Sequence, residues 1–264
     1  MSSRQPAQTV DQKVSPAEKL VQRRISLSRR GEAYGATEGA GPMRFELSKL
    51  PRLLSWRSRQ ERRRVERVFT EIYRTGAWGS SESASGPGST QARAADFLPG
   101  LIAAVRDLGT ATLLDAPCGD FNWASSLAEH VESYVGVDVV AELIARNRKR
   151  FGSPRTRFLR QDILRDRLPS CDTILCRDAL VHFSHADVFA TLANFRRTGA
   201  RFLITTTFLG DRGNEDIETG GWRPINLERE PFRLPPPIAY VDELCHHTNG
   251  IYADKRLGVW RLQE

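Results

Sequence analysis

Between residues 109 and 208, short apolar runs alternate with amphipathic stretches, and this alternation constrains the fold more than any other feature. The apolar runs are expected to be strands and the stretches between them helices. Continuous apolar strands separated by helices are typical of a parallel sheet covered on both faces, hence of an α/β fold. The expected strands are 111–116, 133–140, 156–163, 172–179 and 200–208, and the expected helices are 122–130, 141–151 and 184–199.

Two helices and a loop are expected before this core. Residues 59–76 predict an amphipathic helix that ends at Gly76, because its apolar side chains recur at helical spacing. Its apolar face consists of Val65, Val68, Phe69, Ile72 and Tyr73. A Gly/Ser-rich loop, 78–90, follows, and it is either a linker or the wall of a cleft. Residues 91–108 predict a second helix, which Pro99 could break.

The positive charge of the chain is concentrated at its N-terminal end. The first 67 residues hold 16 of the 39 Lys and Arg residues but only 7 of the 32 acidic residues. We therefore expect a basic, flexible extension over residues 1–58 and one globular domain over 59–264. The rest of the chain has no excess of positive charge with which to bind a phosphate backbone.

The cysteines and the hydropathy pattern argue against a metal site, a redox motif, a membrane span and a signal peptide. The four cysteines, Cys118, Cys171, Cys176 and Cys245, form no CxxC pair, so neither a zinc site nor a redox motif is predicted. No apolar stretch is long enough to span a membrane, and residues 1–20 have no signal-peptide core. We therefore expect a cytoplasmic protein that requires no metal.

An acidic residue ends each of the first three expected strands, namely Asp115, Asp138 and Asp162. The carboxyl ends of parallel strands meet at one edge of the sheet, where such folds bind ligands. Carboxylates there can accept hydrogen bonds from ribose hydroxyls and amino groups. The turn 115–121 has a single glycine and two acids instead of GxGxxG, and acids would repel a diphosphate. The pattern favours a cationic or zwitterionic nucleoside over a dinucleotide.

Four segments then carry a family resemblance: LLDAPCGDF (113–121), YVGVDVV (134–140), FLRQDI (158–163) and DTILCRDALVHF (172–183). In this order they resemble the successive motifs of class I S-adenosylmethionine-dependent methyltransferases. The flanking segments resemble a bacterial group of such domains whose substrates are unassigned. The resemblance implies a Rossmann-like doubly wound sheet, mostly parallel with an antiparallel last strand, and S-adenosylmethionine as the cofactor.

The resemblance also implies which residues contact the cofactor. They are Asp115, Cys118, Gly119, Asp138, Asp162, Ile163 and Arg177. The first three would shape the turn at the methionine part, and Asp138 would bind both ribose hydroxyls. Asp162 would meet the adenine amine with Ile163 beside the ring. Arg177 would lie near the methionine carboxylate or the acceptor. Pro117 and Cys118 depart from the commoner D-x-G-x-G turn.

Asp178 and His182 are the candidate catalytic residues, because they follow the fourth strand, where a methyl acceptor would lie. Methyl transfer is a displacement at carbon, so positioning supplies most of the acceleration. An oxygen or nitrogen acceptor can still need its proton removed, and His182 could act as that base. The alternative is that this segment merely begins a helix and that a backbone group satisfies His182.

Residues 209–237 form a long, polar segment after the fifth strand, and such segments are often functional. We expect it to cover the active site and to bind the substrate through Trp222, Arg223 and Asn226, together with Trp78 from the earlier loop.

The expected function is therefore methyl transfer from S-adenosylmethionine to an oxygen or nitrogen atom of a small molecule or soluble conjugate. Neither nucleic acid nor a membrane is an expected partner of the catalytic domain. Two alternatives stay open. One is an RNA or protein methyltransferase that captures its target with the basic arm. The other is a partner protein that binds S-adenosylmethionine without catalysis.

Overall fold

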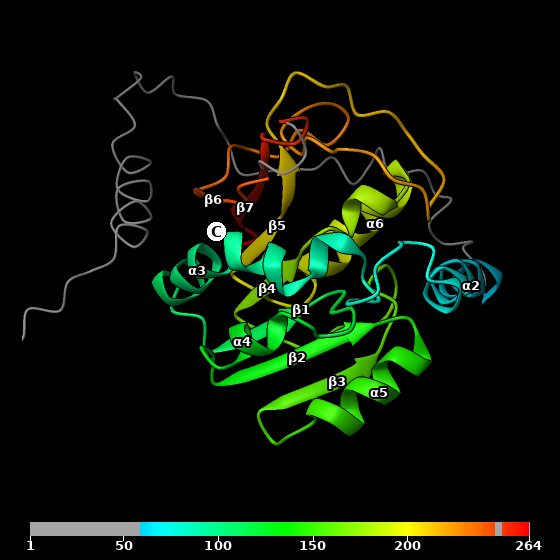
Figure 1. Cartoon of the computed structure of the whole chain (residues 1–264). Helices are drawn as coiled ribbons and strands as arrows, with labels where there is room; N and C mark the ends of the chain where they lie inside the picture. The colour runs from blue at the N-terminus through cyan, green and yellow to red at the C-terminus, as the bar shows by residue number, and fades with distance from the viewer. Residues whose placement is uncertain (1–58, 246–249, 264) are drawn as a thin grey trace, which may run out of the picture. The chain divides into compact units, whose positions relative to one another are not determined.

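A computed structural model describes residues 59–245 and 250–263, and its strands form one seven-stranded sheet (Figure 1). The strand order is β3-β2-β1-β4-β5-β7-β6. Strands β1 to β5 are mutually parallel, whereas β7 runs antiparallel to β5 and β6. The strands are β1 (Thr112–Asp115), β2 (Ser133–Asp138), β3 (Thr156–Arg160), β4 (Thr173–Cys176), β5 (Phe202–Phe208), β6 (Ala239–Asp242) and β7 (Lys255–Arg261).

The helices alternate with the parallel strands as the sequence predicted. They are α2 (Arg59–Thr75), α3 (Gln91–Asp107), α4 (Ala124–Ala128), α5 (Ala141–Phe151) and α6 (His185–Arg196). Two short 3₁₀ turns, η3 (Pro87–Ser89) and η4 (Leu180–His182), lie beside the site described below. The sheet grows outward in opposite directions from β1 and β4, so the carboxyl ends of these two strands flank the crevice in which doubly wound sheets bind ligands. The predicted fold class is confirmed.

Both faces of the sheet are buried, because neighbouring strand residues point to opposite sides. Leu113 and Leu175 face a cluster that contains the apolar sides of α3, α4 and α5. Leu114 and Ile174 face a second cluster, which contains α6 and parts of the segment after β5. This two-sided burial explains why the strands read as unbroken apolar runs.

One of the predicted helices is continuous where a break was possible, and another is shorter than predicted. Helix α3 runs through Pro99 without ending there, because Pro99 lies on the exposed face and Thr90 caps the helix by accepting a hydrogen bond from the Arg93 backbone N–H. Helix α4 keeps only the middle of the predicted 122–130, since its ends are turns. Neither difference moves a strand end.

The segment 209–237 is packed onto the domain. The Leu227 backbone N–H donates to Thr207 Oγ1 of β5, and the Phe208 N–H donates to the Ile225 carbonyl. Ile225, Leu227 and Phe232 are buried. This segment therefore covers the end of β5 as ordered structure.

The predicted extension, residues 1–58, lies outside the described residues, so the division of the chain at that point stays a prediction. In the described part, every helix is too short or too polar to cross a membrane.

Candidate functional site

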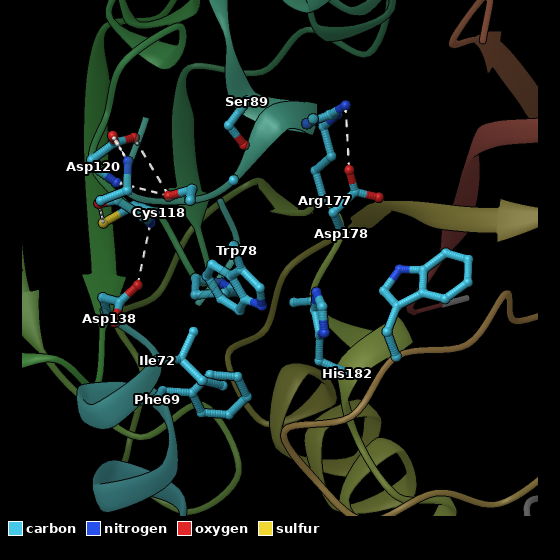
Figure 2. Close-up of a pocket in the computed structure, with 18 of the residues that line it drawn as sticks. Phe69, Ile72, Trp78, Ser89, Cys118, Asp120, Asp138, Arg177, Asp178 and His182 are labelled. Atoms are coloured by element: carbon cyan, nitrogen blue, oxygen red, sulfur yellow. Dashed lines mark hydrogen bonds and ion pairs between the residues drawn. The ribbon is translucent and has the colours of Figure 1, made fainter. Parts of the chain in front are cut away.

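A cavity of about 780 Å³ opens at the carboxyl ends of β1, β2 and β4, the edge at which the sequence predicted a ligand. Its walls come from α2, the loop 77–89, the turn 115–123, η4 and residues 220–222. Figure 2 shows the acids Asp120 and Asp138 on one side of this cavity and Asp178 and His182 on the other. We call these two sides the cofactor end and the acceptor end.

The turn after β1 shapes the cofactor end. The Cys118 backbone N–H donates to the Val137 carbonyl, which ties the turn to β2. Gly119 has φ of 53°, and its N–H donates to Asp138 Oδ2 at 3.2 Å. A Cβ on Gly119 would lie 2.1 Å from Ser85 Oγ, so both the backbone conformation and the space require glycine here.

Asp115 and Asp138 line the cofactor end as buried carboxylates. Burial and, to a smaller extent, the neighbouring Asp138 carboxylate together raise the pKa of Asp115 to about 7, against the hydrogen bond from the Tyr134 hydroxyl. Burial likewise raises the pKa of Asp138 to about 6, although the N–H groups of Val140 and Gly119 favour its charged form. Two carboxylates held this way favour a ligand that brings hydrogen-bond donors and positive charge.

Asp162 and Ile163 lie two and three residues beyond β3 and line the same cavity. Asp162 accepts hydrogen bonds from the Leu164 N–H at 2.9 Å and from Arg165 Nη1 at 2.9 Å. Part of its hydrogen-bonding capacity is therefore used within the protein. Ile163 presents an apolar surface, as expected beside a flat ring.

The loop 78–90 is docked over the turn after β1, and Asp120 holds it there. The Asp120 carboxylate accepts hydrogen bonds from Ser83 Oγ at 3.1 Å and from the Ala84 N–H at 2.8 Å. Its backbone N–H donates to Ser85 Oγ. Of the two interpretations of this loop, the structure supports the cleft wall, because Trp78 and residues 84–89 line the cavity.

His182 lies at the acceptor end, where its ring meets the Trp78 ring at a centroid distance of 5.1 Å (Figure 2). Its Nδ1 lies 2.8 Å from the Gly221 carbonyl oxygen. A carbonyl can only accept, so Nδ1 carries the proton and Nε2 keeps a lone pair in the neutral ring. Burial lowers the pKa of His182, which favours that neutral ring.

Four charged side chains form a compact network beside His182. Arg177 donates to both carboxylate oxygens of Glu243 at 3.1 and 2.8 Å. Lys255 Nζ lies 2.7 Å from Asp178 Oδ2 and 2.9 Å from Glu243 Oε2. Against the cost of burial, Lys255 and Arg177 hold the pKa of Asp178 far below its usual range. Asp178 has φ of 53°, a left-handed conformation uncommon outside glycine, and Thr206 Oγ1 accepts its N–H at 2.8 Å.

The residues proposed for substrate binding in segment 209–237 separate into two groups. Trp222 lines the cavity and is 46% exposed. Arg223 is buried outside it, and its guanidinium donates to the carbonyls of η4 and of residues 183 and 215. Asn226 is also buried outside the cavity, where its side chain accepts the Glu228 N–H. Arg223 and Asn226 thus shape the backbone, which corrects the expectation that they face the substrate.

Sequence reasoning missed four charged residues of the cavity, namely Arg93, Asp120, Glu243 and Lys255. Glu243 and Lys255 come from β6, β7 and their connection, more than 60 residues after Asp178, and no spacing rule links them. Asp120 could have been predicted from the sequence, because it directly follows Gly119 in the turn 115–121, which was expected to bind the ligand.

Comparisons with known proteins indicate the same kind of protein as the cavity does. A family described as a methyltransferase domain matches residues 113–200. Proteins of Mycobacterium tuberculosis and Mycobacterium bovis, each named an uncharacterised methyltransferase, are 34% identical over 163 residues, which is 57% of this chain and 82% of theirs. The chain belongs to the class I S-adenosylmethionine-dependent methyltransferases.

One solved structure shares the fold of this methyltransferase, and a second shows a weaker similarity. The cyclase SpnF is 20% identical, with a TM-score of 0.52 over 75% of this chain and 96% of that one. Magnesium protoporphyrin IX methyltransferase from Synechocystis, solved with bound S-adenosylmethionine, is 16% identical, with a TM-score of 0.44 over 59% of this chain and 81% of that one.

The cavity of the methyltransferase fits S-adenosylmethionine in charge and size. Six carboxylates and three basic side chains line it, a formal excess of three negative charges. The cofactor carries a sulfonium, an ammonium and a single carboxylate, so it brings one net positive charge to that excess. Ligand pockets of drug-sized molecules span roughly 300–1,000 Å³, so the cavity has room for the cofactor with a small acceptor. Asp138, the turn at Gly119 and the Asp162–Ile163 pair are the residues that would hold it.

Among residues 59–245 and 250–263, no group of three or more His, Cys, Asp or Glu side chains is arranged to hold a metal ion.

Proposed function

We propose that the enzyme transfers the methyl group to an oxygen or nitrogen atom of a small molecule or soluble conjugate, with His182 as the general base. The supporting observation is the orientation of His182, whose Nδ1–H is held by the Gly221 carbonyl and whose Nε2 is therefore the basic atom. Trp78 packs against the same ring and fixes its plane. A base oriented by a second group and placed in the ligand cavity matches the geometry that proton abstraction requires.

When bound, S-adenosylmethionine supplies an electrophilic methyl carbon on its sulfonium, and the electron pair of the S–C bond returns to sulfur. The protein residues position the acceptor and accept its proton at His182 Nε2. Helix α2 and the loop 78–90 line the cavity and restrict water around the reacting atoms.

Asp178 is proposed to orient the acceptor and not to remove its proton. Lys255 and Arg177 hold the pKa of Asp178 well below its usual range, so it is ionised near neutral pH and is a weak proton acceptor. As a carboxylate it can still accept a hydrogen bond from an acceptor hydroxyl or amine.

A panel of small hydroxyl and amine compounds, assayed by release of S-adenosylhomocysteine, tests this function. His182→Gln should lower kcat by about 100-fold, the scale of general-base catalysis, and leave the dissociation constant of S-adenosylmethionine within about threefold. In the wild type, kcat at saturating cofactor should fall as pH drops below the usual histidine range, because protonated His182 cannot accept a proton. That acid limb should be missing in His182→Gln.

Two results would refute the proposal. One is cofactor binding without turnover of any compound, which would favour a partner protein that binds S-adenosylmethionine. The other is full activity in His182→Gln.

A further inference from the structure

We propose that the methyl acceptor is an uncharged, planar aromatic molecule that carries a reactive hydroxyl group, that is, a phenol. This inference rests on the proposed function and narrows its substrate class. Three independent features of the acceptor end carry it: the aromatic walls, the charge balance and the proton acceptor.

The aromatic walls come from three separate parts of the chain. Phe69 of α2 packs against Trp78 and Phe183, with ring centroids 6.3 and 5.7 Å apart. On the segment after β5 and before β7, Trp222 packs edge-on against Tyr252 at 5.3 Å. All five rings line the cavity.

These two aromatic groups meet at His182. Trp78 packs on the His182 ring, and the Gly221 carbonyl that holds His182 directly precedes Trp222. A flat ring bound between such walls can make offset-stacked and edge-to-face contacts, each stronger than apolar burial alone. An aromatic acceptor held there would present its substituent to the base.

The charges at the acceptor end balance within the protein. Arg177 and Lys255 are both paired with Asp178 and Glu243, two cations with two anions. The excess negative charge of the cavity therefore lies at the cofactor end, around Asp115 and Asp138. Arg93, the third basic residue of the cavity, pairs with Asp96 through Nη1 at 3.2 Å. An anionic acceptor would therefore meet only cations that already have a carboxylate partner, and a cationic acceptor would lie beside the sulfonium. An uncharged acceptor avoids both costs.

The proton acceptor selects the kind of hydroxyl. A phenol hydroxyl has a pKa of about 10, close enough to histidine for transfer, whereas an aliphatic hydroxyl lies nearer the value of about 15.7 for water. Burial lowers the pKa of His182, which makes proton transfer from an aliphatic hydroxyl still harder. In the reaction, the phenol oxygen supplies the electron pair of the new O–CH₃ bond, and its proton passes to Nε2 and on to solvent. The S–CH₃ bond breaks as the new bond forms, and its electron pair stays on sulfur.

The test is calorimetric titration of matched probes into the enzyme saturated with S-adenosylhomocysteine. The probes are 2-naphthol, its saturated analogue 2-decalol, 2-naphthyl phosphate and 2-naphthylmethylamine. We expect 2-naphthol to bind about tenfold more tightly than each of the other three, the scale of one or two aromatic contacts. Equal or tighter binding of the phosphate, the amine or the saturated alcohol would overturn the inference, as would no binding of 2-naphthol.

Two variants connect the result to the walls. Trp222→Leu should weaken 2-naphthol about tenfold and leave 2-decalol nearly unchanged, whereas Trp222→Phe should keep most of the affinity. Tyr240→Phe, an aromatic change outside the cavity, is the matched control and should change neither probe. An equal loss for both probes in Trp222→Leu would contradict aromatic recognition.

The outcome separates this inference from the proposed function. If 2-naphthol fails to bind but His182-dependent turnover occurs with another compound of the panel, the phenol assignment fails and the function stands. If 2-naphthol binds but no compound is methylated, the proposed function fails even though the site selects aromatic rings.

Discussion

Asp115 shows how a binding residue can lower the stability of the free protein. Its pKa of about 7 lies above the ordinary value of 3.8, so the folded state holds the proton more tightly than the unfolded state. Stability therefore falls as pH rises from about 4 to about 7, and the full cost is present above that range. The hydrogen bond from Tyr134 offsets part of this cost, and a ligand that supplies donors or positive charge would offset more of it.

We predict that Asp115→Asn melts several degrees higher than the wild type at pH 8, because asparagine cannot ionise and can still accept the Tyr134 hydrogen bond. At pH 4 the two proteins should melt at similar temperatures. Thermal melts of the ligand-free proteins across this range measure the difference. If Asp115→Asn were less stable than the wild type at pH 8, ionised Asp115 would not lower the stability of the folded protein.

Sequence reasoning located at the cavity the residues that follow a strand, whereas their contacts with the cofactor stay predictions. Asp115, Asp138 and Ile163 all line the cavity, because the carboxyl ends of parallel strands meet at one edge. It failed for Arg223, because composition does not show whether a guanidinium faces a ligand or backbone carbonyls. The structure shows that this guanidinium is occupied by the carbonyls.

At the scale of elements, two side chains of the turn after β1 anchor the loop 78–90 over the cofactor end. Asp120 accepts hydrogen bonds from the loop, and Asn122 Nδ2 donates to Glu82 and to the Ser89 carbonyl. We predict that Asp120→Ala loosens the loop, since the hydrogen bonds from Ser83 and Ala84 are lost. Cofactor affinity should fall about tenfold, or by about 1.4 kcal/mol, because the loosened loop must be ordered again when the cofactor binds. Hydrogen exchange of residues 79–90 should become faster.

The matched control is Asp211→Ala, which removes an exposed carboxylate paired with Arg229 away from the cavity. It should change neither the affinity nor the exchange. Unaltered exchange in Asp120→Ala would mean that other contacts hold the loop.

Segment 209–237 combines a structural anchor with a cavity wall. Arg223→Ala should lower the free energy of unfolding by roughly 2–4 kcal/mol, because several buried carbonyls lose a charged donor. Trp222→Leu should cost much less, since its side chain is nearly half exposed. Denaturant unfolding of both variants measures this. A larger loss in Trp222→Leu than in Arg223→Ala would reverse the two roles.

The element pattern was predictable because burial on both faces leaves a continuous apolar run for each strand. The ends of the strands were less predictable. Strand β3 stops at Arg160, before the predicted Ile163, because its pairing with β2 ends at Asp138. Helix α3 could not be predicted to pass Pro99, because exposure of that residue is a tertiary property.

For the whole molecule, the cavity is built from segments that the sequence keeps far apart. Asp178, Glu243 and Lys255 form one network although 77 residues separate the first from the last. Such a network depends on β7 pairing with β5, which local patterns do not specify. The sequence therefore located most residues that line the cofactor end and only some of those that line the acceptor end.

The division of the cavity into two ends is tested most directly by calorimetric titration of S-adenosylmethionine at pH 8, where Asp138 is ionised. Asp138→Asn should weaken binding by about 1.5–3 kcal/mol, the scale of hydrogen bonds to a charged acceptor. His182→Gln should bind the cofactor within about threefold of the wild type. Unchanged affinity in Asp138→Asn, or an equal loss in His182→Gln, would contradict this division.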